Sequence, residues 1–210
     1  MAKLSLLSLA LAALLLSPML MGAGTPVPAR HGSAGLTAYP SAPQLCTAAR
    51  ATDLFEKCRP QADVLAAAMA QAQAEDKAVL IEVGADWCAS CIVMDKYING
   101  WFAAGREPPA AGTQTDADAL ARFMAANFVV ARLNVDEASI NPALKPLGLT
   151  SDVSHGVPAF HIVYRGKTSD VRTHEIELRQ PGQKMGFSRK AVLAHFRLAL
   201  AAVRSTARSS

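Results

Sequence analysis

One short stretch, residues 78–91, constrains the fold of this chain more than any other feature. Its first part, Ala78 to Val83, is a mainly apolar run with the length of a buried strand. Trp87-Cys88-Ala89-Ser90-Cys91 follows almost at once, and the pattern from Cys91 to Trp101 predicts a helix. A buried strand that leads into a helix through two cysteines predicts an α/β fold, with the cysteines at the helix N-terminus.

The position of Cys88 favours a reactive thiol. A side chain at a helix N-terminus faces free backbone N–H groups and the positive end of the helix dipole, and both stabilise a thiolate. Cys91 lies about one helical turn further on, close enough to resolve a mixed disulfide on Cys88. A purely structural disulfide is the first alternative, although so short a loop removes little chain entropy. A metal site is the second, but no further CxxC and no HxxxH supplies more ligands.

The rest of the chain alternates between helix and strand patterns. We expect helices over 62–75 and 115–127, the latter capped by Thr115 or Asp116, and a last helix capped by Ser188. Strands are expected over 128–135, 159–164 and 172–178, with Arg165-Gly166-Lys167 joining the last two into an antiparallel hairpin. Two parallel strands linked by a helical crossover, followed by a hairpin and a closing helix, make an α/β sandwich.

The N-terminal residues predict export. Lys3 precedes an apolar stretch from Leu4 to Leu16, and small residues follow up to Ala29. We therefore expect a cleaved signal peptide over 1–29 rather than a membrane anchor. The remainder would lie in the periplasm or outside the cell, where disulfides persist. We divide it into an N-terminal extension over 30–61, a folded domain over 62–203 and a disordered tail over 204–210.

The extension holds a second pair of cysteines, Cys46 and Cys58. In an exported chain we expect them to form a structural disulfide that pins the extension. The alternative is a second redox couple that exchanges electrons with Cys88 and Cys91.

Composition narrows the functional classes further. Hydrophobic residues make up 51% of the chain and charged residues 18%, which excludes an intrinsically disordered protein. The formal net charge is only +4, and lysine and arginine form no basic stripe. We therefore expect no nucleic-acid partner.

Three segments together resemble the thioredoxin-like superfamily. Residues 80–91 resemble its second strand and active-site turn, Arg132 to Asp136 resembles a following strand, and Gly156 to Phe160 resembles the segment with the cis-proline. The Ala-Asp-Trp-Cys-x-x-Cys variant is similar to exported members, including the C-terminal periplasmic domain of DsbD-type reductases. The resemblance implies a thioredoxin-like α/β fold, in which helices flank both faces of a central mixed sheet.

The resemblance also assigns roles to single residues. Cys88 would be the attacking nucleophile, Cys91 the resolving thiol and Glu82 the buried acid beneath them. A carboxyl buried without a partner has a raised pKa and could relay a proton to Cys91, whereas a strand-edge acid would simply reach solvent. Val157 and a cis Pro158 would bind an extended substrate peptide, and Trp87 would form part of the docking surface.

Arg132 would either hold Glu82 ionised or cap the sheet. Ala89-Ser90 replaces the Gly-Pro that is common between the two cysteines of the family, and residues 105–113 resemble a loop insertion. His155 would lie near the active site or in a solvated loop.

These observations predict an exported thiol–disulfide oxidoreductase, and the resemblance to DsbD-type reductases implies that it reduces disulfides of envelope proteins. We expect no cofactor and no metal, a monomer, protein disulfides as substrates, and a membrane or soluble thiol–disulfide protein as electron donor. One alternative is a binding or metal-delivery chaperone that holds Cu(I) through Cys88 and Cys91. A disulfide isomerase or oxidase is another.

Overall fold

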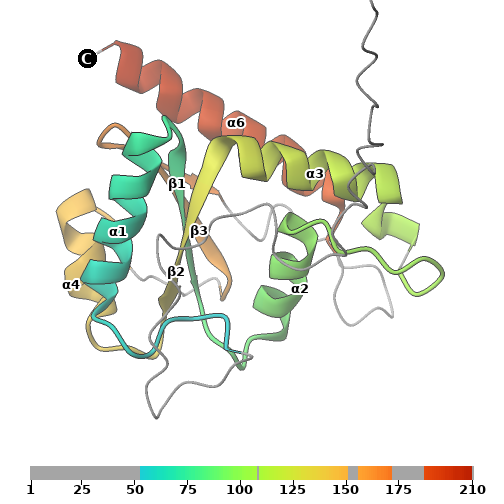
Figure 1. Cartoon of the computed structure of the whole chain (residues 1–210), viewed down its shortest axis with the longest axis horizontal. Helices are drawn as coiled ribbons and strands as arrows, with labels where there is room; N and C mark the ends of the chain where they lie inside the picture. Colours follow the sequence, from blue (N-terminus) through green and yellow to red (C-terminus); the bar gives the residue numbers. More distant parts are fainter. Residues whose placement is uncertain (1–52, 108, 151–155, 172–186, 210) are drawn as a thin grey trace, which may run out of the picture. The chain divides into compact units, whose positions relative to one another are not determined.

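A computed structural model describes residues 53–107, 109–150, 156–171 and 187–209 of the 210-residue chain (Figure 1). The predicted signal peptide, Cys46, His155 and the predicted strand over 172–178 lie outside these residues. The first half of the described chain contains α1 (Gln61–Ala74), β1 (Ala78–Gly84), α2 (Ala89–Ile98), a short 3-10 helix η1 (Pro109–Ala111) and α3 (Gln114–Asn127). The second half contains β2 (Phe128–Asn134), α4 (Ile140–Leu144), η2 (Lys145–Leu147), β3 (Ala159–Tyr164), β4 (Lys167–Val171) and α6 (Arg189–Arg208).

Within the described residues, the strands form one mixed sheet in the order β2-β1-β3-β4. The central strand β1 pairs in parallel with β2 and antiparallel with β3, and β4 completes the hairpin at the edge. This register places Glu82 of β1 between Arg132 of β2 and Phe160 of β3. The parallel β1–β2 pair with its helical crossover confirms the predicted α/β arrangement.

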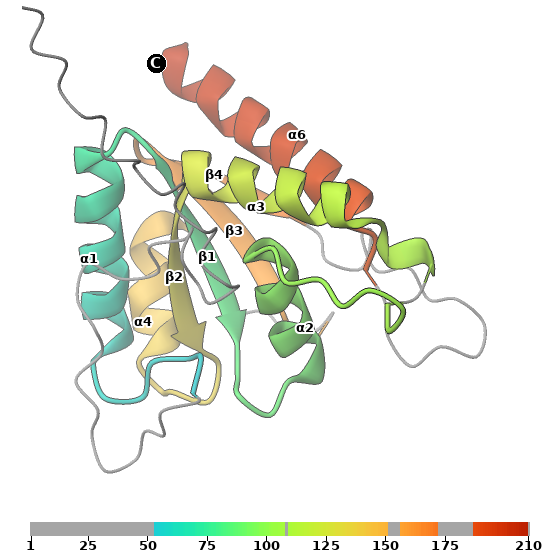
Figure 2. The same cartoon turned by 45° about the vertical axis from the view of Figure 1, so that its right-hand side comes forward.

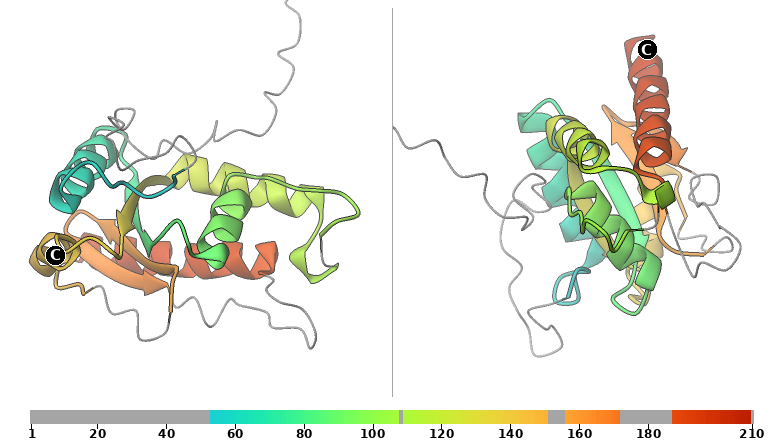
Figure 3. Two further views of the ribbon diagram at one scale, coloured as in Figure 1. Left: turned by 90° about the horizontal axis from the view of Figure 1, so that it is seen from below. Right: turned by 90° about the vertical axis from the view of Figure 1, so that its right-hand side faces the viewer.

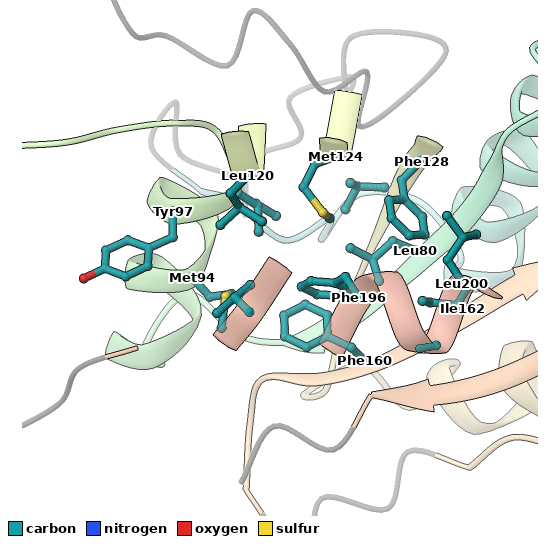
Figure 4. Packing of buried hydrophobic residues seen from close by; sticks show 14 of the residues in the cluster. Leu80, Met94, Tyr97, Leu120, Met124, Phe128, Phe160, Ile162, Phe196 and Leu200 are labelled. Carbon is teal, nitrogen blue, oxygen red and sulfur yellow. The ribbon is translucent and has the colours of Figure 1, made fainter. Parts of the chain in front are cut away.

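Both faces of the sheet are covered, because side chains alternate between the faces along each strand. Leu80, Phe128 and Phe160 pack with α2, α3 and α6 into one core (Figure 4). Ile81 and Val129 belong to a second core with α1 and α4. These two helices lie on the opposite side of the sheet from α2, α3 and α6 (Figure 2). All seven residues of β1 are buried, so the strand that precedes the two cysteines is the centre of the fold.

Helix α2 ends at Ile98, three residues before the predicted end at Trp101. The N–H of Gly100 donates to the carbonyl of Tyr97 over 3.1 Å, and the N–H of Trp101 donates to Lys96 over 2.8 Å. This is a Schellman ending, which needs a left-handed residue, and Gly100 has a φ of +78°. Helix α2 also begins earlier than predicted, at Ala89.

Helix α3 is capped by Thr113, so the prediction of Thr115 or Asp116 as its cap is wrong. The Thr113 hydroxyl accepts the N–H of Asp116, and the Asp116 carboxylate accepts the N–H of Thr113 over 2.8 Å. This reciprocal capping box explains why the helix begins after Thr113, because it requires Asp116 as the third residue of the helix and not as its cap.

The β3–β4 hairpin has a tighter turn than predicted. Arg165 and Gly166 have φ values of 49° and 75°, which is the two-residue turn that matches the twist of paired strands. Lys167 therefore already pairs with Tyr164, and the second strand begins there instead of at Arg172.

Helix α6 lies against this hairpin (Figure 3) and continues to Arg208. Residues 204–208, predicted as a disordered tail, are therefore helical. Val203 is buried, and Arg204 donates to the side-chain oxygen of Asn127 over 3.2 Å. These contacts hold the last turns of the helix on the domain. No helix in the described ranges has both the length and the apolar character needed to cross a membrane.

The loop between α2 and α3 is held by a buried arginine at the start of α6. Arg189 is fully buried and donates to Glu107 over 3.1 Å, to the carbonyl of Trp101 over 2.8 Å and to that of Ala111 over 3.1 Å. Its guanidinium also lies 3.7 Å from the centre of the Tyr97 ring. The predicted loop insertion over 105–113 is thus tied to the core.

Candidate active site

Cys88 and Cys91 lie where β1 passes into α2, and they form a disulfide with an Sγ–Sγ distance of 2.15 Å. Cys88 is the N-cap of α2, and its sulfur accepts the backbone N–H of Cys91 over 3.1 Å. This is the contact that stabilises negative charge on a sulfur at a helix N-terminus. Cys88 is 4% exposed and Cys91 is completely buried, so the two sulfurs are not equivalent.

The segment before β3 faces the disulfide. The Val157–Pro158 peptide bond is cis, and the carbonyl oxygen of Val157 lies 3.5 Å from the sulfur of Cys88. Ser90 donates its hydroxyl to the same carbonyl over 3.3 Å. Val157 also packs against the two cysteines. The residues predicted to bind substrate backbone are therefore beside the attacking sulfur.

Trp87 lies on the surface next to Cys88. Its side chain is 67% exposed, and its Nε1 donates to Asp136 over 2.8 Å. The hydrogen bond orients the ring, while most of its apolar surface stays open to a partner.

Glu82 lies beneath this turn, on the same sheet face as α2. It is fully buried, and neither carboxylate oxygen has a hydrogen-bond partner among the described residues. Burial raises the pKa of Glu82 to about 8, against an opposing effect of the Arg132 charge. The sequence left open whether Glu82 is buried or reaches solvent at the edge of a strand, and the structure shows that it is buried.

Arg132 connects Glu82 to a second acid. Its Nε lies 3.5 Å from Glu82 Oε2, and its Nη2 pairs with Asp95 of α2. The charge of Asp95 contributes to the raised pKa of Glu82. Arg132 thus faces two carboxylates, and its charge lowers the pKa of Glu82 by less than burial raises it.

Three residues near the site escaped the sequence analysis: Asp95, Ser90 and Phe55. Asp95 follows Cys91 by four residues, so its place on the inner face of α2 could have been read from helical spacing. Ser90 was noted only as a replacement for the proline of the family. Phe55 is 2% exposed and packs against both cysteines, although it is more than 30 positions away in sequence. No local pattern predicts such a contact.

Cys58 is disulfide-bonded. Its predicted partner, Cys46, lies outside the described residues, so their pairing stays a prediction. Within the described ranges, no group of three or more His, Cys, Asp and Glu side chains is arranged to hold a metal ion.

Part of the chain is similar to known proteins. The model of a family described as thioredoxin-like matches residues 60–99, which span α1, β1 and α2 and include Glu82 and both cysteines. A solved structure described as a disulphide isomerase from Xylella fastidiosa Temecula1 is similar, with 20% sequence identity and a TM-score of 0.41. The similarity covers 57% of this chain and 78% of that one. No curated protein matches the chain.

Proposed function

We propose that this chain, a thioredoxin-like protein and a thiol–disulfide oxidoreductase, is exported and reduces disulfides of envelope proteins. The observation that carries the proposal is the geometry of Cys88. Its sulfur caps α2, accepts the N–H of Cys91 and faces the cis Val157–Pro158 segment. The reducing direction is supported by the resemblance of residues 85–91 to DsbD-type reductases, and export by the N-terminal sequence.

The reaction begins from the dithiol form. The Cys88 thiolate attacks one sulfur of a substrate disulfide, which forms a mixed disulfide and releases the other substrate sulfur as a thiolate that takes up a proton. Cys91 then loses its proton and attacks the Cys88 sulfur. The second substrate thiolate leaves, and the Cys88–Cys91 disulfide is formed. Two electrons pass to the substrate, and a thiol–disulfide donor must return them.

Glu82 takes part in the second step as a proton carrier. An ionised Glu82 carboxylate accepts the proton of Cys91, and a protonated Glu82 returns it when the donor reduces the disulfide. A pKa of about 8 suits both directions, because both forms are populated close to neutral pH.

The substrate would lie along the Val157–Pro158 segment. An extended peptide can pair with the backbone of Val157, which brings a substrate sulfur beside Cys88. The exposed ring of Trp87 offers apolar surface at the edge of the same site.

Trapping of the mixed disulfide tests the proposal. We expect the wild-type chain to reduce insulin with dithiothreitol as the electron source, and Cys88→Ser to be inactive. Cys91→Ser should form a mixed disulfide with insulin that remains on Cys88 until excess thiol is added, because the resolving thiol is absent. The double variant Cys46→Ser/Cys58→Ser is the matched control, since it removes both cysteines outside the pair and leaves no unpaired thiol behind. An active Cys88→Ser, or a Cys91→Ser that forms no mixed disulfide, would contradict the proposal.

A further inference from the structure

Residues 53–60, which we call the strap, precede α1 and lie against the active-site disulfide. Within the strap, Phe55 is 2% exposed and forms a small apolar cluster with Cys88 and Cys91. Leu54 and Val157 pack at the edge of this cluster. The strap belongs to the part of the chain that the sequence predicts as an extension, yet its aromatic ring lies in the active site.

The ring of Phe55 and the sulfur of Cys91 meet above Gly84. A Cβ at Gly84 would lie 2.5 Å from Cζ of Phe55 and 2.9 Å from Sγ of Cys91. Both distances are shorter than real contacts, so residue 84 must be glycine for the ring and the sulfur to come this close. The ring thus occupies the space next to the buried sulfur.

Asp86 joins the strap to the active-site turn. Its Oδ1 accepts the N–H of Leu54 over 2.7 Å and that of Phe55 over 3.3 Å. Its Oδ2 lies 2.8 Å from the ammonium of Lys57. Asp86 is only two residues before Cys88, so the strap and the attacking sulfur are held by the same turn.

Hydrogen bonds also hold the C-terminal end of the strap. Glu56 is buried, and its carboxylate accepts the N–H of Cys58 over 2.8 Å and Nε of Arg59 over 3.1 Å. The side chain of Gln61 donates to the carbonyl of Glu56 over 3.1 Å and accepts the N–H of Asn134 in β2 over 2.8 Å. These bonds fix Phe55 from both sides.

We propose that Phe55 is a positioning residue that covers the sulfur of Cys91 and so directs incoming thiolates to Cys88. The inference rests on the proposed function. Exchange requires a thiolate to reach one sulfur of the disulfide, and access decides which sulfur is attacked. Attack on Cys88 forms the donor–Cys88 bond and releases Cys91 as a thiolate, which takes a proton from Glu82. Attack on Cys91 would place the mixed disulfide under the Phe55 ring, where there is no room for it.

Alkylation of the reduced chain by iodoacetamide tests this role without a substrate protein. Cys91 is followed in a Cys88→Ser background and Cys88 in a Cys91→Ser background. We expect Phe55→Ala to raise the alkylation rate of Cys91 by about tenfold or more and that of Cys88 by less than about twofold. Phe55→Leu should restore most of the protection, because it refills the space beside the sulfur.

Phe187→Ala is the matched control. Phe187 is also 2% exposed, but its ring packs against Tyr97 in the larger core and is not part of the cluster that holds the two cysteines. We expect it to leave the Cys91 rate within about twofold of the wild-type rate under conditions where the protein is folded. Should Phe55→Ala fail to fold, Asp86→Ala removes the anchor of the strap and should raise the Cys91 rate in the same direction.

Three results would overturn the inference: an unchanged Cys91 rate in Phe55→Ala, equal acceleration at Cys88 and Cys91, or the same acceleration in Phe187→Ala. The last two would mean general loosening of the fold. Because alkylation needs only the thiols, such a result leaves the insulin assay unaffected. A failure of the proposed function would instead appear in the insulin assay, as an absence of disulfide reduction.

Discussion

At the scale of single residues, Glu82 combines full burial with a carboxylate that has no hydrogen-bond partner among the described residues. It is fully buried in β1 between Arg132 of β2 and Phe160 of β3, and Arg132 also pairs with Asp95. The sequence predicted the acid and its burial as one of two possibilities, because position 82 lies inside an apolar strand. It could not predict that Arg132 is divided between two carboxylates, since that depends on where α2 packs.

The raised pKa of Glu82 makes stability depend on pH. The folded chain keeps the Glu82 proton up to a pKa of about 8, whereas the unfolded chain releases it near the ordinary value of 4.5. Stability from this group is therefore fully present below 4.5 and is lost as pH rises through about 8. In the oxidised wild-type chain we expect the free energy of unfolding to fall by at most about 1.4 kcal/mol per pH unit over this range. Glu82→Gln should abolish this decrease.

Urea unfolding at a series of pH values between 5 and 8 would measure this slope. Asp95→Asn is a useful companion variant, because the charge of Asp95 raises the pKa of Glu82. Its removal should end the decrease at a lower pH. Parallel profiles for wild type and Glu82→Gln would show that Glu82 is ionised in the folded chain, contrary to this account.

At the scale of secondary-structure elements, the helices and strands that follow a hydrophobic periodicity were predicted from the sequence. The element ends that depend on turn geometry were not. Helix α1 and strands β1 and β3 lie within one residue of their predicted limits. The end of α2 at Ile98, the Thr113 cap and the start of β4 at Lys167 were each missed, because each depends on the backbone geometry of a turn. The position of the strap beside the cysteines was not predicted. It depends on hydrogen bonds to Asp86, which is about 30 residues further along the chain, and to Gln61 of α1.

The ion pair between Arg189 and Glu107 gives a prediction at this scale. It joins α6 to the loop after α2, and both side chains are nearly or fully buried. Removing one partner of a buried pair leaves the other charge without compensation. We expect Arg189→Met to lower the free energy of unfolding by about 3–5 kcal/mol, as measured by urea unfolding.

Lys190→Met is the control for this substitution, because the next residue of the same helix is exposed. Its effect should stay within about 0.5 kcal/mol. The Tyr97 hydroxyl also donates to Glu107 over 2.9 Å, so the loss in Arg189→Met includes a disturbed tyrosine. Equal stability of the two variants would mean that the loop is held by other contacts.

At the scale of the whole molecule, the sheet order places everything needed for exchange at one end of β1. Cys88 and Cys91 follow β1, the Val157–Pro158 segment precedes the adjacent β3, and Trp87 bonds to Asp136 beyond β2. This assembly was predicted through the resemblance of three short motifs to one family, because each motif is local enough to be recognised in the sequence. The strap that completes the site from the N-terminal side became visible only in three dimensions.

The proposed function requires Cys88 and Cys91 to be a reducing dithiol. The most direct test is the reduction potential of this pair, obtained by equilibrating the chain with glutathione and dithiol buffers and measuring the oxidised fraction by mass spectrometry. We predict a value near that of thioredoxin-like reductants, about −270 mV. A value near that of strong oxidants, about −120 mV, would contradict the reducing direction, and a pair that never exchanges would contradict the enzyme itself.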